Sequence, residues 1–265
     1  MHIWIFSQNS LIKLMKHKET VKKWFSNPEK MAFIRISSTG LEDLPVEVPD
    51  ENIAIFDFAD IEENKWLMDI DRFIKAEDRL EKITGIRPRY SPIKDEEARE
   101  IVEFVEKMLE KGVEVLYIHC DEGKSRSPSV AYAIAKYILE DEALAEYFDA
   151  PFYNLNKTVI KKIKNAYIQT LKEKLECNTF VYVDSNHNER HHIFSKEKSK
   201  SFCGLFEALT DTGLCDLPDY EMFYETFYDY VNTPESYDGI CKTCLKLYNK
   251  KFESFYKKLK KIEKL

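Results

Sequence analysis

The chain has 265 residues, of which 44% are hydrophobic and 33% are charged, a composition typical of one or two globular domains. Its net charge of −7 argues against a protein that binds nucleic acid or anionic membranes through broad charge attraction. No apolar run reaches the length of a membrane helix, and the opening residues 1–6 are too short for the apolar core of a signal peptide. We therefore expect a cytoplasmic protein whose cysteines stay reduced.

Strand-like and helix-like segments alternate along the first part of the chain. The apolar runs of strand length are His2–Ser7, Met31–Ser37, Asn52–Phe58 and Val113–Ile118. The segments with helical spacing are Leu11–Phe25, Asp95–Lys111, Ser127–Leu139 and a stretch from about Asn156 to Leu175. This alternation predicts an α/β domain over residues 1–175, with a mostly parallel sheet and helices on both faces.

A charged segment, roughly Lys65–Ser91, lies between the third predicted strand and the helix that begins at Asp95. Its large apolar residues recur at near-helical spacing: Trp66, Phe73, Ile74 and Leu80. Two interpretations stay open, a helical cover over a functional site or a surface helix with a buried stripe.

The most informative segment is His119–Ser127, which joins a predicted strand to a predicted helix. A short loop between a strand and a helix N-terminus directs amide groups inward and favours a bound anion. The same field favours the ionised, nucleophilic form of Cys120. Arg126 can hold two phosphate oxygens with its planar guanidinium, and Gly123 suits a tight loop.

Two further residues have supporting roles in this interpretation. The hydroxyl of Ser127 can hydrogen-bond the cysteine sulfur and ease its departure in a second step. We expect His119 to fix the loop through hydrogen bonds. The alternative for Cys120 alone is a small buried hydrophobic residue at a strand end, which the surrounding pattern makes the weaker reading.

The motif His119-Cys120-x5-Arg126-Ser127 resembles the signature of cysteine-dependent protein tyrosine and dual-specificity phosphatases. The resemblance covers residues 1–175. It implies a cysteine nucleophile, a cysteinyl-phosphate intermediate, no catalytic metal, and a phosphotyrosine or phosphoserine/threonine protein substrate. The loop positions that would surround the phosphate are Asp121, Glu122, Gly123, Lys124, Ser125 and Arg126.

The two acidic loop residues are a departure from a purely electropositive loop. In this type of loop the amides face the phosphate and the side chains face outward, so we expect Asp121 and Glu122 to have a modest effect. Lys124 offsets part of their charge.

The resemblance also implies an upstream aspartate as general acid. Asp60 is our best candidate, because it follows a predicted strand whose end lies at the same sheet edge as Cys120. The segment after it lengthens the gap to the cysteine, so Asp57, Asp69 and Asp71 stay as competitors. An aspartate at this position can also simply cap a turn or helix.

Residues 176–265 have a different pattern and predict a small α+β zinc-binding domain. Residues 177–184 and 191–194 predict a β-hairpin across a polar turn. The residues His192, Cys203, Cys241 and Cys244 resemble the His…Cys-Gly…Cys-x-x-Cys pattern of small zinc modules. His191 can replace His192, and Cys177 or Cys215 can enter the set. Unpaired buried thiols or a redox pair are the alternatives.

The sequence leaves two classes of function open. The first is an active phosphatase, in which zinc serves only the C-terminal domain and catalysis needs no cofactor. The second is a phosphate-binding adaptor with weak or no turnover, whose C-terminal domain contacts a protein partner. Related enzymes with this loop act on RNA 5′ ends or phosphoinositides. The acidic charge weighs mildly against both substrates, so no nucleic-acid or membrane partner is expected.

Overall fold

The computed structural model describes residues 1–16, 27–37, 41, 44, 47–85, 88–176, 179–183, 191–195, 200–201 and 257–264. The chain divides into two compact units, Met1–Tyr167 and Ile168–Leu265. The described part of the chain contains no helix that is both long enough and apolar enough to cross a membrane.

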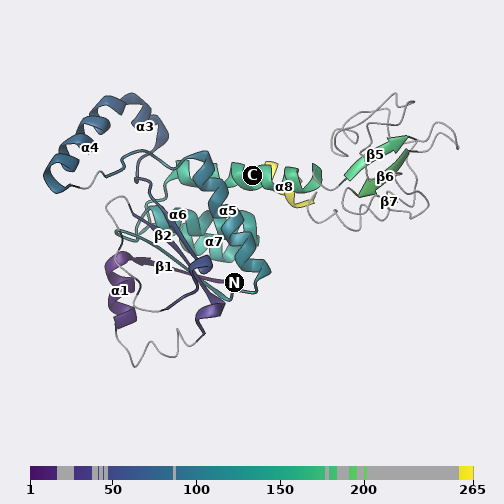
Figure 1. Ribbon diagram of the computed structural model, residues 1–265, viewed down its shortest axis with the longest axis horizontal. Helices are drawn as coiled ribbons and strands as arrows, with labels where there is room; N and C mark the ends of the chain where they lie inside the picture. Colours follow the sequence, from purple (N-terminus) through teal and green to yellow (C-terminus); the bar gives the residue numbers. More distant parts are fainter. Residues whose placement is uncertain are drawn as a thin grey trace. The chain divides into compact units, whose positions relative to one another are not determined.

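A four-stranded parallel sheet forms the centre of the first unit (Figure 1). Its strands are β1 (His2–Ser7), β2 (Met31–Ile36), β3 (Ile53–Phe56) and β4 (Val115–Cys120), in the order β1-β4-β2-β3. The register pairs Ser7 with Cys120, Arg35 with His119, and Ile36 with Phe56. The carboxyl ends of all four strands therefore meet at one edge of the sheet, as the sequence predicted.

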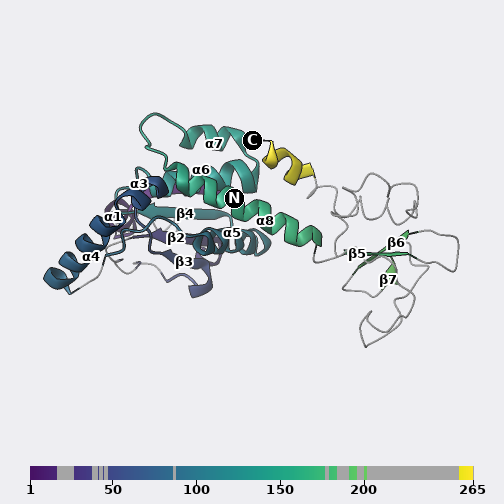
Figure 2. The same cartoon turned by 90° about the horizontal axis from the view of Figure 1, so that it is seen from above.

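Helices cover both faces of this sheet, which confirms the predicted α/β class (Figure 2). Helix α1 (Gln8–Lys16) packs Leu11 against Met31, Phe33 and Tyr117. Because side chains alternate along a strand, the neighbouring residues of β2 and β4 face the opposite side. There α6 (Arg126–Ala133) contacts β4 and β1, and α5 (Asp95–Glu110) contacts β3.

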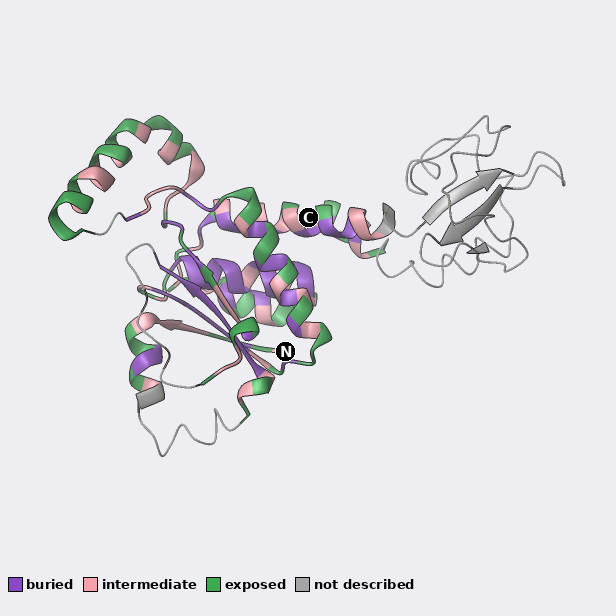
Figure 3. Cartoon of the chain, in the orientation of Figure 1, coloured by how far each residue is buried: buried purple, intermediate pink, exposed green. Residues whose placement is uncertain are grey.

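Helix α6, which follows the loop, is the most buried of the described helices (Figure 3). Every residue of α6 except Tyr132 is buried. Helix α6 continues into a π-type turn, η3 (Ile134–Leu139), and then come α7 (Glu142–Phe148) and α8 (Lys157–Glu176). Asp141 caps α7 by accepting a hydrogen bond from the Leu144 amide at 3.0 Å.

The charged segment after Asp60 forms two helices, α3 (Glu63–Met68) and α4 (Ile70–Thr84), as its spacing indicated. Neither contains a buried residue. Helix α4 is attached through Phe73, whose ring lies 6.4 Å from that of Tyr90, and through Glu77, which accepts the Tyr90 amide at 2.7 Å. Gly85 ends α4 in a left-handed conformation.

The remaining described elements are short. The 3-10 turns η1 (Pro28–Lys30) and η2 (Asp50–Asn52) precede β2 and β3. In the second unit β5 (Thr179–Val183) pairs antiparallel with β6 (His191–Ser195), which confirms the predicted hairpin, and β7 (Lys200–Ser201) pairs with β6.

Candidate active site

The loop between β4 and α6 directs donors at the sulfur of Cys120. The Gly123 amide donates a hydrogen bond to Sγ at 3.2 Å, and Ser127 Oγ lies 3.2 Å from the same atom. Cys120 is only 2% exposed. These contacts arise because β4 ends at Cys120 and α6 begins at Arg126, so the five intervening residues must turn back on the sulfur.

Gly123 is required by both conformation and space. Its φ is +72°, in the left-handed region that side chains disfavour. A Cβ atom there would lie 2.6 Å from the amide nitrogen of Ser7 and 2.8 Å from the carbonyl carbon of Phe6. The loop therefore packs directly on the backbone at the end of β1. Ser7 is itself fixed, because its hydroxyl accepts the Ser10 amide at 3.1 Å at the start of α1.

Arg126 is buried at the mouth of the loop, with 7% exposure. Its Nη1 donates to the carbonyl oxygen of Phe58 at 3.0 Å, and its Nη2 donates to Oδ2 of Asp121 at 2.6 Å. Its Nε has no hydrogen-bond partner among the described residues. A buried guanidinium with one unpaired N–H can donate a hydrogen bond to an anion bound there.

Asp121 differs from the sequence-based expectation, which placed its side chain away from the loop. Its carboxylate pairs with Arg126 and accepts a second hydrogen bond from Ser37 Oγ at 2.9 Å. Ser37 follows β2, so the orientation depends on a neighbouring strand and not on the loop alone. Glu122 and Lys124 do face outward, with side chains 77% and 73% exposed and 3.9 Å apart.

Asp60 lies beside this loop, where the sequence placed the general acid. Its Oδ1 accepts hydrogen bonds from Ser125 Oγ at 2.7 Å and from Asn156 Nδ2 at 3.0 Å. Of its competitors, Asp69 and Asp71 lie at the start of α4. Desolvation raises the pKa of Asp57 and nearby Arg89 opposes that shift. Asp57 therefore stays a competitor on electrostatic grounds, while Asp60 has the direct contacts with the loop.

Asn156 is a site residue that the sequence analysis did not identify. Its side-chain oxygen accepts the amides of Thr158 and Val159, at 3.0 and 3.2 Å, at the start of α8. Its side-chain nitrogen Nδ2 donates to the Asp60 carboxylate. One side chain therefore both caps the start of a helix and orients the carboxylate. The signal in the sequence was an asparagine directly before a helical segment, a common N-cap.

Ser129 ties the same asparagine to the loop. Its hydroxyl donates to the Ser125 carbonyl at 2.6 Å and accepts a hydrogen bond from the backbone amide of Asn156 at 2.7 Å. The Asn154 amide also donates to the Lys124 carbonyl at 2.9 Å. The segment before α8 therefore supports the backbone of the loop between β4 and α6 from outside.

His119 lies beneath the loop and contacts Arg35 on the adjacent strand. Arg35 Nε donates to His119 Nε2 at 3.0 Å, and both residues are buried. Burial, together with the charge of Arg35, lowers the pKa of His119 from 6.5 to about 4, although Asp121 opposes this shift. His119 is therefore neutral at pH 7. Its hydrogen bond connects it to β2 and not to the loop, and its Nδ1 has no partner among the described residues, so hydrogen bonding to the loop stays a prediction.

A cleft of about 530 Å³ opens beside Arg126. Its lining comes from the segment after β3, from α4, from the segment before α5 and from the start of α6: Ala59, Asp60, Ile61, Arg72, Phe73, Ala76, Tyr90 and Arg126. Helix α4 thus forms one wall of the cleft next to the loop. Of the two interpretations of this segment, its residues fit the helical cover, and α4 buries no stripe.

The predicted zinc ligands fall mainly outside the described residues. Cys203, Cys241 and Cys244 lie there, as do the alternatives Cys177 and Cys215. His192 and His191 belong to β6, of which only the backbone is described. Within the part of the chain that the structure describes, no group of three metal-binding side chains occurs. The zinc site stays a prediction.

No protein-family model matches this sequence, and the search of curated proteins finds no significant match. The function must therefore be inferred from the chemistry of the site itself.

Proposed function

We propose that this protein is a phosphatase that hydrolyses phosphomonoesters through a cysteinyl-phosphate intermediate. The supporting observation is the buried pair of Cys120 and Arg126 at one loop. The sulfur receives an amide and a hydroxyl contact at 3.2 Å, and Arg126 Nε is free of partners among the described residues. Such a site joins a nucleophile to an anion-binding cradle.

In the first step of the proposed reaction, the Cys120 thiolate attacks phosphorus. The S–P bond forms as the bond to the leaving oxygen breaks, and Asp60 transfers its proton to that oxygen. Arg126 and the loop amides stabilise the charge on the equatorial oxygens. The hydrogen bonds from Ser125 and Asn156 orient the Asp60 carboxyl for this transfer.

In the second step, water attacks the cysteinyl-phosphate. Asp60 accepts the proton of the water as the new O–P bond forms, and the S–P bond breaks to release phosphate. The Ser127 hydroxyl stabilises the departing thiolate, from which it lies 3.2 Å away. No metal takes part. The thiolate needs a reducing compartment, which supports a cytoplasmic location.

Phosphotyrosine in proteins is the first proposed substrate, because the rings of Phe73 and Tyr90 line the cleft beside Arg126 and can pack on an aromatic leaving group. Phosphoserine and phosphothreonine form the second class. Phosphoinositides and RNA 5′ phosphates belong in the same substrate panel.

One observation favours the second candidate function, a phosphate-binding adaptor. The Asp121 carboxylate already binds Nη2 of the Arg126 guanidinium, and its negative charge opposes the binding of a phosphate dianion. In either function we assign the C-terminal domain a zinc ion on His192, Cys203, Cys241 and Cys244 and a role in docking a protein partner. Metal analysis of the full chain tests this; a zinc content well below one ion per chain contradicts it.

Turnover of an aryl phosphate by wild-type protein tests the main proposal. Cys120→Ser should lower kcat by at least about 10⁴-fold, because no other nucleophile replaces the thiolate. Asp60→Asn should lower kcat by about 10²–10⁴-fold. Asp149→Asn, an exposed change at the end of α7, is the control and should leave kcat unchanged.

Three results would count against these assignments. Activity that survives Cys120→Ser refutes the nucleophile. A large loss in Asp57→Asn with none in Asp60→Asn moves the general acid to Asp57. Tight phosphate binding without any turnover in the wild-type protein supports the adaptor.

A further inference from the structure

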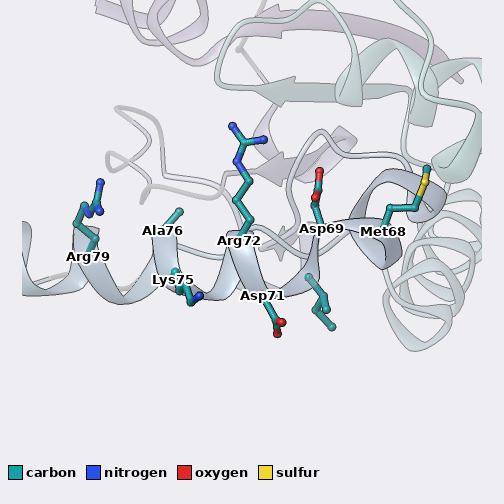
Figure 4. Close-up of a pocket in the computed structure, with 8 residues that line it drawn as sticks. Met68, Asp69, Asp71, Arg72, Lys75, Ala76 and Arg79 are labelled. Carbon is teal, nitrogen blue, oxygen red and sulfur yellow. The ribbon is translucent and has the colours of Figure 1, made fainter.

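A second cleft, of about 640 Å³, lies along α4 next to the cleft at Arg126 (Figure 4). Its lining is Met68, Asp69, Ile70, Asp71, Arg72, Lys75, Ala76 and Arg79. Arg72 and Ala76 line both clefts. The two hollows are therefore adjacent, and a ligand bound at Arg126 can extend along α4.

Three cationic side chains of α4 line the second cleft: Arg72, Lys75 and Arg79, which we call the cationic stripe. The spacing of seven residues places Arg72 and Arg79 on one side of the helix, and Lys75 lies between them along the chain. In Figure 4 the side chains of Arg72 and Arg79 extend to the same side of α4 as Asp69, whereas Lys75 and Asp71 extend the other way. All three are exposed.

The cations of the stripe are not neutralised within the described residues. None of the three forms an ion pair there, although α4 carries Glu77, Asp78 and Glu81. By contrast, Arg99 on α5 pairs with Glu103 at 2.9 Å. Asp69 and Asp71 line the same cleft, so three positive and two negative side chains leave a small positive excess there, on a chain with a net charge of −7.

We propose that the cationic stripe selects phosphopeptides that carry acidic residues close to the phosphorylated residue. This inference rests on the proposed function, because it assigns the scissile phosphate to Arg126. From Arg72 to Arg79 the helix rises by about 10 Å. An extended peptide covers that length in about three residues, so carboxylates two to four positions from the phosphorylated residue meet the stripe.

A short acidic peptide fits these observations better than an extended anionic surface. The stripe has three cations, whereas membrane recognition by basic clusters typically uses about four to eight. A membrane or an RNA duplex would also meet the acidic surface around the stripe, and that repulsion opposes binding. A peptide in the second cleft meets the three cations together with Asp69 and Asp71, so only a small excess of positive charge faces it.

Two phosphotyrosine peptides test the proposal, one with Asp or Glu on both sides of the phosphotyrosine and one with Asn or Gln at those positions. Wild-type protein should show a kcat/KM for the acidic peptide about threefold to thirtyfold higher than for the neutral one. This ratio corresponds to the combined free energy of a few exposed ion pairs. The preference should shrink as salt rises from about 0.05 to 0.5 M.

Charge variants locate the effect on α4. Arg72→Gln/Arg79→Gln should reduce the ratio of the two kcat/KM values to about two or less, because it leaves one cation of the stripe. Lys13→Gln/Lys65→Gln removes the same charge from exposed positions outside both clefts and should keep the wild-type ratio. A ratio near one in wild-type protein, or an equal loss in both variants, overturns the proposal.

Failure of the phosphatase proposal can be told apart from failure of this one. If wild-type protein turns over an aryl phosphate but treats both peptides alike, only the stripe proposal fails. If it turns over nothing, peptide affinities measured on the Cys120→Ser protein by fluorescence anisotropy decide the inference: a preference that Arg72→Gln/Arg79→Gln removes supports it, and equal affinities overturn it. Faster hydrolysis of phosphoinositide vesicles or RNA 5′ phosphates than of either peptide overturns the peptide assignment.

Discussion

The loop between β4 and α6 and the helix α4 line the same cleft, yet they are built in opposite ways. In the loop region Cys120, Ser125, Arg126 and Ser127 are each at most 7% exposed. Helix α4 has no buried residue and is attached mainly through Phe73 and Glu77. The loop buries the side chains that face the sulfur and exposes only Glu122 and Lys124 widely, whereas α4 leaves most of its side chains to solvent.

Under the proposed function, this difference separates two tasks. Bond-making chemistry needs groups fixed to within a fraction of an ångström, and the loop obtains this from contacts with β1, β2 and the segment before α8. Recognition of a flexible peptide tolerates looser positions, because exposed charges act over several ångströms. Substitutions should therefore be costly in the loop and mild on α4.

The sharpest test of this comparison uses two glycines with the same backbone conformation. Gly123 in the loop and Gly85 at the end of α4 both have φ near +72°. At Gly123 a Cβ would lie 2.6 Å from backbone, whereas at Gly85 nothing lies within 4 Å. We expect Gly123→Ala to lower the free energy of unfolding by about 3 kcal/mol, since steric overlap adds to left-handed strain.

Gly85→Ala is the matched control and should cost only the strain, about 1 kcal/mol. Urea unfolding of the three proteins measures both values, and aryl phosphate turnover should fall only in Gly123→Ala. Equal costs at the two sites would mean that the loop can move away from β1, and the contrast between the two regions would be lost.

The sequence was sufficient for the parts of the site that are local. Cys120, Gly123 and Arg126 stand within seven residues, and a strand-loop-helix pattern positions them without reference to the rest of the chain. Alternating strand and helix periodicities predicted the parallel sheet. The position of Asp60 near Cys120 was predicted because the strands before these two residues end at the same edge of that sheet.

The contacts that complete the site were not predictable, because they join distant segments. Asp60 meets Ser125 and Asn156 across 65 and 96 residues. The orientation of Asp121 depends on Ser37, 84 residues away. Periodicity predicted the helix α4, but no local pattern shows which cleft a surface helix lines.

The second prediction concerns the support beneath the loop and depends on pH. An ordinary histidine titrates near 6.5, but His119 titrates at about 4 in the folded protein. Between these values the unfolded chain binds a proton that the folded protein excludes, so stability falls as pH drops through this range. Well above pH 6.5 this effect takes nothing from the free energy of unfolding. By pH 4 it has lowered that free energy by about 3 kcal/mol.

His119→Gln keeps an acceptor for Arg35 but cannot titrate. The difference in unfolding free energy between wild type and this variant should therefore shift in favour of the variant between pH 7 and pH 4.5. Urea unfolding at four pH values measures it. A constant difference across this range would show that His119 has the same pKa in the folded protein as in the unfolded chain. Substitutions on α4, far from this group, should not alter the slope.

The smallest expected effect separates two roles of Asp121. Its carboxylate orients Arg126, but its charge also opposes a phosphate dianion bound to the same guanidinium. Asp121→Asn preserves the shape and can still accept from Arg126, so it removes mainly the charge. We expect the inhibition constant of phosphate or vanadate to fall by about threefold to tenfold, a modest Coulomb term in a partly exposed site. If inhibition instead weakens, the carboxylate serves chiefly to hold Arg126 in place. Because the change lies inside the loop, it should act on every substrate alike, whereas loss of the cationic stripe should act on acidic peptides alone.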